Sequence, residues 1–402
     1  MKNRVVITSY GFVSSIGKNE DEIIESFKTD RTNFKVSDFD KEIAICPING
    51  FNFKDYTGKF KDSRYITRGA AFALASAFQA VKKSGLNKNE LSKAGLFIGS
   101  GPNFDIDSEF NYSANNGIDW NKLQALWILK FLPNTGSSLI AKLLGIHGEN
   151  LTIGTACSAS LQAIGEAYRR IKDRYLDLAF AGGGDSRISK GGLLAYKKAH
   201  ALMQTMGNPV KEYIPFKKDR NGFIPGEGGA FFLLESEKHA NKRGVKILAE
   251  ISGYSSSIDG YNMTAPEPTG KFAEYALKRA LDEAGLSSDD INFISTHGTG
   301  TPLNDAMESV LIDRFYKKKP YMTAFKSWVG HLSAASGAIE LALTILCMKK
   351  SFFPKIRLLD DPCNENLNFI YKNLEFSPEN LIIENFGFGG QNAVLAIKKW
   401  KE

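Results

Sequence analysis

The stretch LTIGTACSASLQAIGEAYRR, residues 151–170, places a cysteine between a short apolar strand and an amphipathic helix. Leu151–Ile153 is the strand candidate, and the helix candidate covers Ala159–Arg174. Cys157 would then stand at a helix N-terminus, where unpaired N–H groups and the helix dipole lower the pKa of a thiol. The pattern predicts a nucleophile at a strand-to-helix junction. An inert buried thiol is the alternative for this cysteine taken alone.

Strand and helix candidates alternate on both sides of this junction. Such alternation predicts an α/β fold with largely parallel sheets. The other strand candidates are Val5–Thr8, Ala94–Ile98, Leu178–Ala181, Gly229–Leu234, Ile247–Tyr254, Asn292–Ser295, Pro320–Ala324, Leu381–Asn385 and Ala393–Lys399. The other helix candidates are Glu20–Lys28, Ser63–Lys83, Lys271–Ala284, Asp305–Phe315 and Leu332–Lys349.

The chain divides into two halves of similar order. Each half has an early strand, a long helix that ends near a Gly-Leu pair (Gly85 and Gly285 begin these pairs), and a later strand-to-loop junction with a reactive residue. No fixed repeat period is present, so we expect two fused half-domains. The expected division is 1–240, which carries the cysteine, and 241–402.

Composition excludes several function classes. The 402 residues are 43% hydrophobic and 24% charged, as in ordinary globular proteins. The net charge of +7 is spread out, whereas a nucleic-acid binder normally has a denser cluster of positive charge. A mildly basic surface suits an acidic protein partner equally well. Four scattered cysteines indicate reduced thiols, and the short apolar run at the start does not resemble a signal peptide. We therefore expect a cytoplasmic protein.

Two histidines occur in glycine-rich or small-residue surroundings. His297 lies in THGTGTP, residues 296–302, and His331 ends KSWVGH, residues 326–331. Both are expected at strand or helix ends, where α/β folds place ligand sites. A neutral imidazole there can donate a hydrogen bond to a carbonyl or to a developing enolate. A structural histidine is the alternative for each one alone.

Two charged residues flank His331 in the sequence. Glu340 lies inside an apolar helix candidate and would need a cation, which Lys326 can provide. Two unrelated surface charges are the alternative. Further on, NFGFGGQN, residues 385–392, predicts a tight turn that presents backbone N–H groups. A plain glycine turn is the alternative there, and the chain has no Walker sequence. Gly182–Asp185 is interpreted as tight packing at a strand end.

These motifs together resemble the β-ketoacyl-acyl-carrier-protein synthases, and most closely the chain-elongating types I and II. The resemblance covers residues 4 to about 398 and implies a thiolase fold, a five-layered αβαβα sandwich of two pseudo-equivalent halves. It is carried by TACSA (155–159), HGTGTPLNDAME (297–308), KSWVGH (326–331), GFGG (387–390) and PFKKDRNGFIPGE (215–227).

The resemblance implies a division of labour in the site. Cys157 would accept an acyl group from an acyl-carrier protein, and His297 and His331 would support decarboxylation of a malonyl-carrier protein and stabilise the enolate. The N–H groups of Cys157 and Phe388 would form the oxyanion hole, with Phe388 also acting as a gate. Lys326 and Glu340 would support the histidines. Thr299, Thr301 and Gly389 would bind substrate.

The same resemblance implies that the enzyme binds no cofactor or metal of its own, because the phosphopantetheine arm of the acidic carrier protein delivers the substrates. A homodimer is expected, and a heterodimer with a chain-length-factor-like subunit is possible. Basic residues that precede or open the helix candidate 63–83 could dock the carrier, or could form only a solvated face: Lys59, Lys61, Arg64 and Arg68.

Departures and alternatives concern the substrate more than the reaction. Lys217 and Asn221 stand where the family usually has acids, and Gly101–Asp107 replaces a glycine-rich loop near the acyl pocket of relatives. This favours a specialised pathway, such as polyene or polyketide synthesis, over ordinary fatty-acid elongation. A thiolase would have a second cysteine in the motif at 387–390. A non-catalytic chain-length-factor-like subunit, the alternative function, would lack Cys157.

Overall fold

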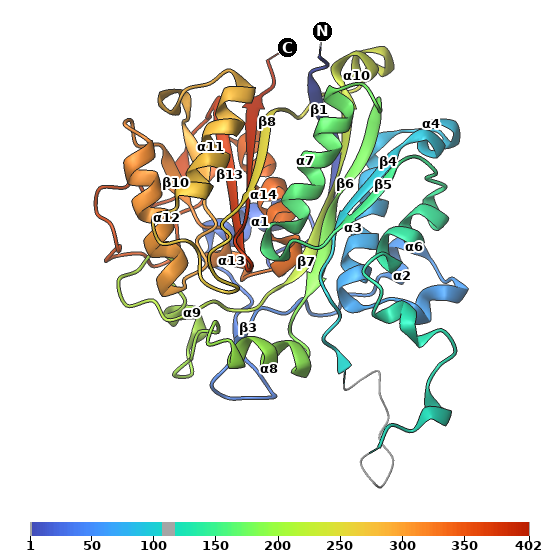
Figure 1. The fold of residues 1–402 in the computed structure, drawn as a ribbon, viewed down its shortest axis with the longest axis horizontal. Helices are drawn as coiled ribbons and strands as arrows, with labels where there is room; N and C mark the ends of the chain where they lie inside the picture. Colours follow the sequence, from blue (N-terminus) through green and yellow to red (C-terminus); the bar gives the residue numbers. More distant parts are fainter. Residues whose placement is uncertain (1, 107–116, 402) are drawn as a thin grey trace.

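A single ten-stranded sheet forms the centre of the computed structural model, which describes residues 2–106 and 117–401. The strand order is β10-β9-β13-β14-β8-β1-β7-β6-β4-β5 (Figure 1). The central pair is β1 and β8, each the first strand of its half. Outward from this pair, each half then places the fifth, fourth, second and third of its strands, numbered in sequence order. The first half contains β1 (Val5–Val13), β4 (Gly95–Gly99), β5 (Asn150–Ile153), β6 (Leu178–Ser186) and β7 (Glu227–Ser236). The second contains β8 (Ala249–Ile258), β9 (Phe293–Ser295), β10 (Tyr321–Thr323), β13 (Asn380–Gly387) and β14 (Gln391–Lys399).

All ten strand candidates from the sequence are strands of this sheet, but the prediction of largely parallel sheets is wrong. The outer strands pair in parallel, β5 with β4 and β9 with β10 and β13. The central strands pair antiparallel, from β6 through β7, β1, β8 and β14 to β13. Strands buried on both faces appear as continuous apolar runs in either direction, so their sequence does not report the pairing.

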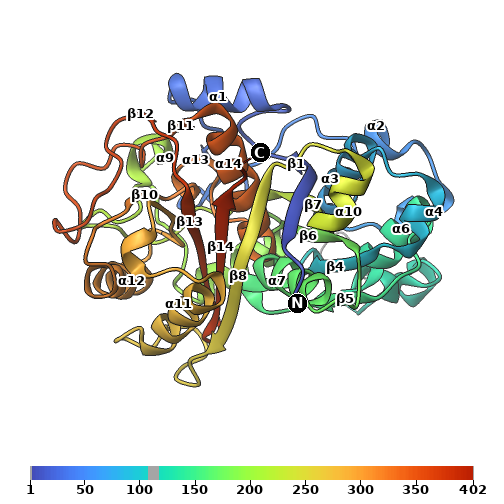
Figure 2. The same cartoon turned by 90° about the horizontal axis from the view of Figure 1, so that it is seen from above.

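Helices pack on both faces of the sheet, and two of them lie between its two halves (Figure 2). Helix α3 (Arg68–Ser84) packs on β1, β7 and β6, and α11 (Lys271–Ala284) packs on β8 and β14. Helices α7 (Ala159–Lys172) and α14 (Ser336–Lys350) contact each other between the two halves (Figure 2). With the two halves of the sheet counted as separate layers, the order helix, half-sheet, helix pair, half-sheet, helix is the predicted five-layered thiolase fold.

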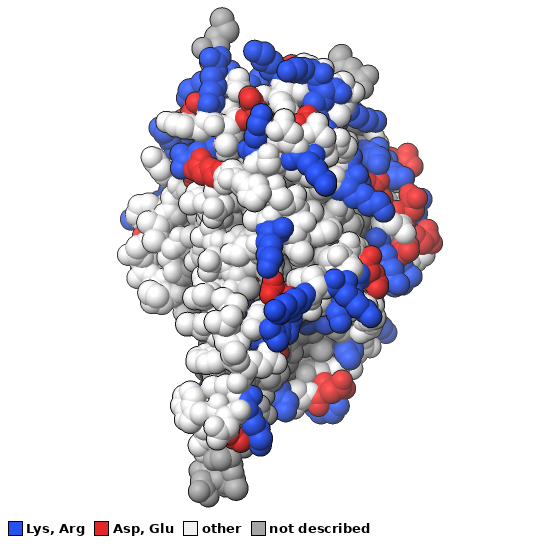
Figure 3. All heavy atoms as spheres, turned by 90° about the vertical axis from the view of Figure 1, so that its right-hand side faces the viewer, with Lys and Arg blue, Asp and Glu red and all other residues white. Residues whose placement is uncertain are grey.

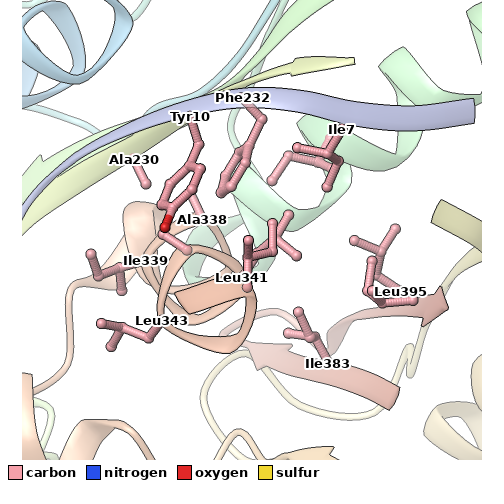
Figure 4. Packing of buried hydrophobic residues seen from close by; sticks show 14 of the residues in the cluster. Ile7, Tyr10, Ala230, Phe232, Ala338, Ile339, Leu341, Leu343, Ile383 and Leu395 are labelled. Carbon is pink, nitrogen blue, oxygen red and sulfur yellow. The ribbon is translucent and has the colours of Figure 1, made fainter. Parts of the chain in front are cut away.

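The largest hydrophobic cluster lies around α14, where the two halves meet. Figure 4 shows α14 surrounded by side chains from β1, β7, β13 and β14. Helix α14 is buried along nearly its whole length, because both halves of the sheet pack against it. The cluster includes Ile7, Tyr10, Phe232, Ala338, Ile339, Leu341, Leu343, Ile383 and Leu395.

Two sequence-based assignments differ in detail from the structure. The helix expected at 63–83 begins at Arg68, after a short 3-10 turn at Lys61–Tyr65, because Thr67 caps it by accepting from the Ala70 N–H. The glycines at 182–184 lie inside β6 and not at its end. A Cβ on Gly182 would stand 2.1 Å from the Ala230 carbonyl oxygen, so the close approach of β7 requires glycine there.

The remaining elements are shorter or lie at the surface. Among the described residues no helix combines the length and apolar character needed to cross a membrane. Two small strand pairs are β2 (Lys35–Val36) with β3 (Ala44–Ile45), and β11 (Phe352–Phe353) with β12 (Leu374–Glu375). The other helices are α1 (Glu20–Lys28), α2 (Lys54–Thr57), α4 (Lys88–Lys93), α6 (Thr135–Leu144), α8 (Lys190–Lys198), α9 (Pro209–Glu212), α10 (Glu237–Arg243), α12 (Pro302–Phe315) and α13 (Lys326–Val329).

Candidate active site

Cys157 lies in a tight 3-10 turn, Ala156–Ser158, between β5 and α7. The preceding Ala156 has φ of +48°, a conformation that costs energy for a residue with a Cβ. Gly387 packs against this turn, and a Cβ at that position would lie 3.0 Å from the Cys157 nitrogen. The backbone of the glycine-rich turn thereby reaches the cysteine.

Burial determines the protonation state of Cys157. Burial raises the pKa of the thiol to about 11, against the charge of Lys326 and the N–H of Phe388, which both lower it. The expectation of a lowered pKa at a helix N-terminus is therefore wrong, because the loss of hydration outweighs the helix dipole. The resting group is a thiol with donors already arranged for the thiolate.

His331 lies directly against the cysteine. Its Nε2 is 3.1 Å from the Cys157 Sγ, and its Nδ1 accepts the backbone N–H of Ser333 at 3.2 Å. The Ser336 hydroxyl is 2.9 Å from the same Nδ1. Because a backbone N–H can only donate, the ring proton is on Nε2 and points at the sulfur. Burial, then the charge of Lys326, holds the pKa of His331 well below its usual value, so the imidazole is neutral.

His297 faces the same space from the end of β9. Its Nδ1 is 3.2 Å from the Lys326 Nζ, which as an ammonium can only donate, so its Nε2 also carries the proton. The two imidazole rings lie 5.5 Å apart at nearly a right angle. Burial, followed by Lys326, holds the pKa of His297 well below its usual value. Two neutral N–H donors thus converge beside one thiol.

Lys326 and Glu340 form a buried ion pair beneath the histidines. The Lys326 ammonium donates to a Glu340 carboxylate oxygen and, at 2.6 Å, to the His297 carbonyl oxygen. The second carboxylate oxygen of Glu340 accepts from the Asn385 amide at 2.6 Å. The sequence alone assigns no role to Asn385. A polar residue inside an apolar strand is the signal that could have found it.

Two carboxylates hold the loop after His297. Asp305 accepts the backbone N–H groups of Thr299 and Gly300, and Glu308 accepts those of His297 and Gly298. Burial, followed by the nearby charge of Asp305, raises the pKa of Glu308 to about 8, against the N–H groups of Gly298 and His297, which lower it. These bonds fix the backbone that carries His297. Both acids belong to the quoted motif, but the sequence alone assigns them no task.

A cavity of about 250 Å³ opens onto the three reactive side chains. The hydroxyls of Thr299 and Thr301 bond each other at 2.9 Å on its wall. The ring of Phe388 also lines it, next to the ring of Tyr196. Gly389 does not line this cavity, and its N–H donates to the Met263 carbonyl at 2.8 Å. The Cys157 thiol and both imidazoles thus line one cavity, the reaction channel.

The nucleophile and the two imidazoles also satisfy the spacing of a metal site. One ligand atom from each of Cys157, His297 and His331 lies within 4.8 Å of the others. A Cys-His-His set suits Zn²⁺. The Lys326 ammonium next to His297 opposes a dication there, so this arrangement favours thioester chemistry.

The predicted docking residues have mixed surroundings. Arg68 donates to both carboxylate oxygens of the buried Glu227, which ties the start of α3 to β7. The role that the structure shows for Arg68 is therefore to hold α3 against β7, and not to dock a partner. Near Lys61 and Arg64, Asp62 is paired with Lys142 of α6.

Of the residues that depart from the family pattern, Asn221 is exposed, Lys217 is half-buried, and the variant loop extends beyond the described residues. Asn221 places an amide that donates to the Gln204 carbonyl oxygen at 3.3 Å. Lys217 pairs with the exposed Asp360 at 3.3 Å. Asp107, the last residue of the variant loop, lies outside the described residues.

Two family models match the chain in sequence. The N-terminal domain of β-ketoacyl synthase matches residues 2–240, and the C-terminal domain matches residues 248–359. Together these matches include the cysteine and both histidines.

Curated relatives match over essentially their full length. The 3-oxoacyl-[acyl-carrier-protein] synthase 2 of Vibrio cholerae is 30% identical over 99% of each chain. The enzyme of the same name from Synechocystis is 31% identical over 100% of this chain and 99% of its own. A solved β-ketoacyl synthase from Burkholderia phymatum is 28% identical, with a TM-score of 0.92 over 100% of both chains. The ishigamide ketosynthase/chain length factor structure is also 28% identical, with a TM-score of 0.90 over 100% of both chains.

Proposed function

The chain belongs to the β-ketoacyl synthase family, and we propose that it lengthens acyl chains by decarboxylative condensation of two thioesters carried on acyl-carrier protein. One observation carries this function best. A thiol and two neutral imidazoles, both protonated on Nε2, line the same channel.

In the first step Cys157 takes the acyl group. Its sulfur attacks the carbonyl of the incoming thioester, the bond to the pantetheine sulfur breaks, and the thiol proton leaves with the released pantetheine. The Nε2–H of His331, the charge of Lys326 and the N–H of Phe388 stabilise the thiolate that attacks. The N–H groups of Cys157 and Phe388 hold the oxyanion.

In the second step a malonyl thioester enters the emptied channel. Its carboxylate leaves as carbon dioxide, and the electron pair of the broken bond passes to the thioester oxygen as an enolate. The two imidazole N–H groups stabilise this oxygen without a strong base, because decarboxylation itself supplies the carbanion. The carbanion attacks the acyl carbonyl on Cys157, and the thiolate leaves and is protonated again.

Other residues support these steps. Lys326 and Glu340 fix the backbone of His297, while Thr299 and Thr301 line the cavity that would admit the pantetheine arm. The identical strand order of the two halves supports the division 1–240 and 241–402. The names of the curated relatives favour the type 2 elongating enzyme, with substrates delivered by a carrier protein.

The chain would work as a homodimer. Strand β5 ends the sheet and pairs only with β4 among the described residues, so its outer edge can accept a strand from a second copy. A solved ketosynthase in complex with a chain length factor shares this fold, at 23% identity and a TM-score of 0.81. A heterodimer is the other possible outcome.

The test separates the two half-reactions with two variants. Cys157→Ala should give no acyl-enzyme mass adduct with acyl-carrier protein. His331→Ala should still be acylated, but should release carbon dioxide from malonyl-carrier protein at least about a hundredfold more slowly, as for loss of a positioned donor. His147→Ala, at the surface after α6, is the matched control and should behave as wild type. An adduct on Cys157→Ala, or unchanged decarboxylation by His331→Ala, would refute the assignment.

A further inference from the structure

Two completely buried carboxyl groups meet beside the loop that carries His297. Glu308 lies on α12 and Glu384 on β13, and both side chains are fully shielded from solvent. The Glu384 carboxyl is in hydrogen-bond contact with the Glu308 carboxyl. The proposed reaction steps give Glu384 no task, although a buried acid is costly unless it has a partner.

Both carboxyl groups lie in an otherwise apolar layer of the fold. Alternate residues of a strand point to the same side, so Glu384 faces the same way as Ile382 and Phe386. On α12, Glu308 shares a helix face with Leu311, three residues further on. The three apolar residues belong to one hydrophobic cluster, so the backbone directs both acids into the same layer.

The hydrogen-bond donors around this pair all point at Glu308. Its Oε1 accepts the His297 N–H at 2.6 Å, and its Oε2 accepts the Gly298 N–H at 2.8 Å and the Asn304 amide at 3.0 Å. Among the described residues no N–H or O–H group donates to either oxygen of Glu384. A carboxylate can only accept, so a hydrogen bond between the two carboxyls requires a proton on one of them.

The surroundings favour retention of that proton. Burial, followed by the charge of Glu308, raises the pKa of Glu384 well above its usual value. Lys326 of α13 lowers the pKa of Glu308 by its charge, against the larger effect of burial. The Lys326 ammonium donates to Glu340 and to the His297 carbonyl oxygen. We therefore expect the pair to hold a proton at neutral pH.

The other titratable groups around the pair do not neutralise it. Asp305, also on α12, raises the pKa of Glu308 by its negative charge. Burial raises the pKa of Tyr316, at the end of α12, and the charge of Glu384 adds to this effect. Within the described part of the chain the Tyr316 hydroxyl has no hydrogen-bond partner. On β14 the residue opposite Glu384 is the uncharged Val394.

We propose that Glu384 is a protonated carboxylic acid at neutral pH, whose O–H donates to the Glu308 carboxylate and thereby positions His297. The inference rests on the proposed function, in which the His297 imidazole stabilises the enolate. Glu308 accepts from three other groups and is the better site for the negative charge, so the proton belongs to Glu384. The O–H bond holds the Glu308 carboxylate where it accepts both loop N–H groups.

Infrared spectroscopy detects the protonated acid directly, because the C=O stretch of a carboxylic acid is distinct from the bands of a carboxylate. The difference spectrum between wild type and Glu384→Gln at neutral pH should contain one carboxylic-acid band that shifts in D₂O. Glu379→Gln is the matched control, since Glu379 is exposed just before β13 and the hydrogen bond and charge of Lys401 lower its pKa. Its difference spectrum should contain no such band.

The same proton should appear in the pH dependence of unfolding. A carboxyl group whose pKa is higher in the folded than in the unfolded protein stabilises the fold at low pH, and this contribution is lost as the pH rises. Between about pH 6 and about pH 8, the unfolding constant in urea should increase about tenfold more per pH unit for wild type than for Glu384→Gln. That difference corresponds to one proton released on unfolding.

Two substitutions of Glu384 test its effect on decarboxylation of malonyl-carrier protein. Glu384→Gln retains an N–H donor for Glu308 and should keep nearly the wild-type rate. Glu384→Met removes the donor and should be about tenfold slower, as for loss of one hydrogen bond to a charged group. Acylation of Cys157 should be unchanged in both variants. At alkaline pH the wild-type rate should fall as the pair loses its proton, whereas the rate of Glu384→Gln should not.

Each measurement can overturn the inference separately from the proposed function. Absence of the acid band, or equal pH dependence of unfolding in wild type and Glu384→Gln, would exclude the protonated state even if Glu384→Met does not fold. Wild-type decarboxylation by Glu384→Met, or an equal loss of acylation and decarboxylation, would exclude the positioning role. A wild-type protein that forms no adduct at Cys157 would contradict the proposed function, while the infrared band would still report the protonation of Glu384.

Discussion

At the scale of single residues, burial keeps all three reactive groups uncharged at neutral pH. It raises the pKa of Cys157 and lowers those of His297 and His331, and in each case burial is the largest cause. A neutral imidazole can donate its Nε2 proton to a developing oxyanion, whereas a thiol with donors around it becomes a thiolate only when a substrate is present. The site thus avoids a permanently reactive thiolate.

This protonation state predicts how alkylation of Cys157 depends on pH. Only the thiolate reacts with iodoacetamide, and with a pKa of about 11 its fraction rises about tenfold for each pH unit well below that value. We therefore expect the rate at Cys157, measured by peptide mass spectrometry, to rise steadily from about pH 7 to about pH 9. A rate that is already level over this range would show a low pKa and contradict the structure.

The sequence identifies the reactive residues but not their protonation. The glycines and small residues around Cys157, His297 and His331 mark positions where backbone and substrate approach closely, and this pattern is local. The depth of burial depends on α7, α14 and both halves of the sheet, which no local pattern records. The same limit applies to Asn385, whose contact with Glu340 spans 45 residues of sequence.

At the scale of elements, the two halves have the same kind of turn before their central helices. Before α7, Ala156 has φ of +48°, and before α14, Ser333 has φ of +46°. Each strained turn brings a reactive residue, Cys157 or His331, to the N-terminal end of one of the two central helices. Ser160 of α7 accepts the Ala338 N–H of α14 at 3.0 Å, so the two helix starts are joined directly. The packing of α7 on α14 therefore sets the distance between sulfur and imidazole.

Variants of the ion pair between Lys326 of α13 and Glu340 of α14 should change the stability of the fold and the rate of decarboxylation to different extents. Lys326→Met leaves Glu340 buried and unpaired, and we expect the free energy of unfolding to fall by about 3–5 kcal/mol. Lys326→Met/Glu340→Leu removes both charges and should recover most of that loss. Urea unfolding measures both effects.

The double variant should nevertheless decarboxylate malonyl-carrier protein poorly. It lacks the ammonium that donates to the His297 carbonyl and stands beside its Nδ1, so the imidazole is no longer oriented. The exposed pair of Lys350 with Asp21 provides the control, since Lys350→Met should change neither property by much. A stable double variant with wild-type decarboxylation would exclude a positioning role for Lys326.

The sequence predicts helices and strands well where apolar runs are strong. It does not predict features that depend on which strands are neighbours in the sheet. Glu20–Lys28 and Lys271–Ala284 have the predicted bounds because caps or glycines mark their ends. The antiparallel centre of the sheet and the glycines within β6 depend on which strand lies next door. Neighbours across a sheet are set by topology, and one sequence contains no direct record of it.

At the scale of the whole molecule, one side is suited to contact with a second copy. It includes the outer edge of β5, and the space-filling view of that side shows a broad area without charged side chains (Figure 3). The segment that precedes α6 exposes several large apolar side chains, which is unusual for a surface that only meets water. They are Trp120, Leu126, Ile128 and Leu132, which are 69%, 61%, 51% and 41% exposed.

We expect the purified protein to be a dimer through this side. Light scattering after size-exclusion chromatography should give twice the mass of one chain. A charge placed in a buried apolar contact is costly, so Trp120→Glu and Leu126→Glu should each shift the protein toward the monomer at micromolar concentration. Tyr275→Glu on α11, 55% exposed in the other half, is the matched control and should remain a dimer.

Two outcomes of this measurement are informative. A wild-type monomer that dimerises only with a second, related chain would replace the homodimer by a heterodimer on the same face. Dissociation by Tyr275→Glu but not by Trp120→Glu would move the interface to the opposite half.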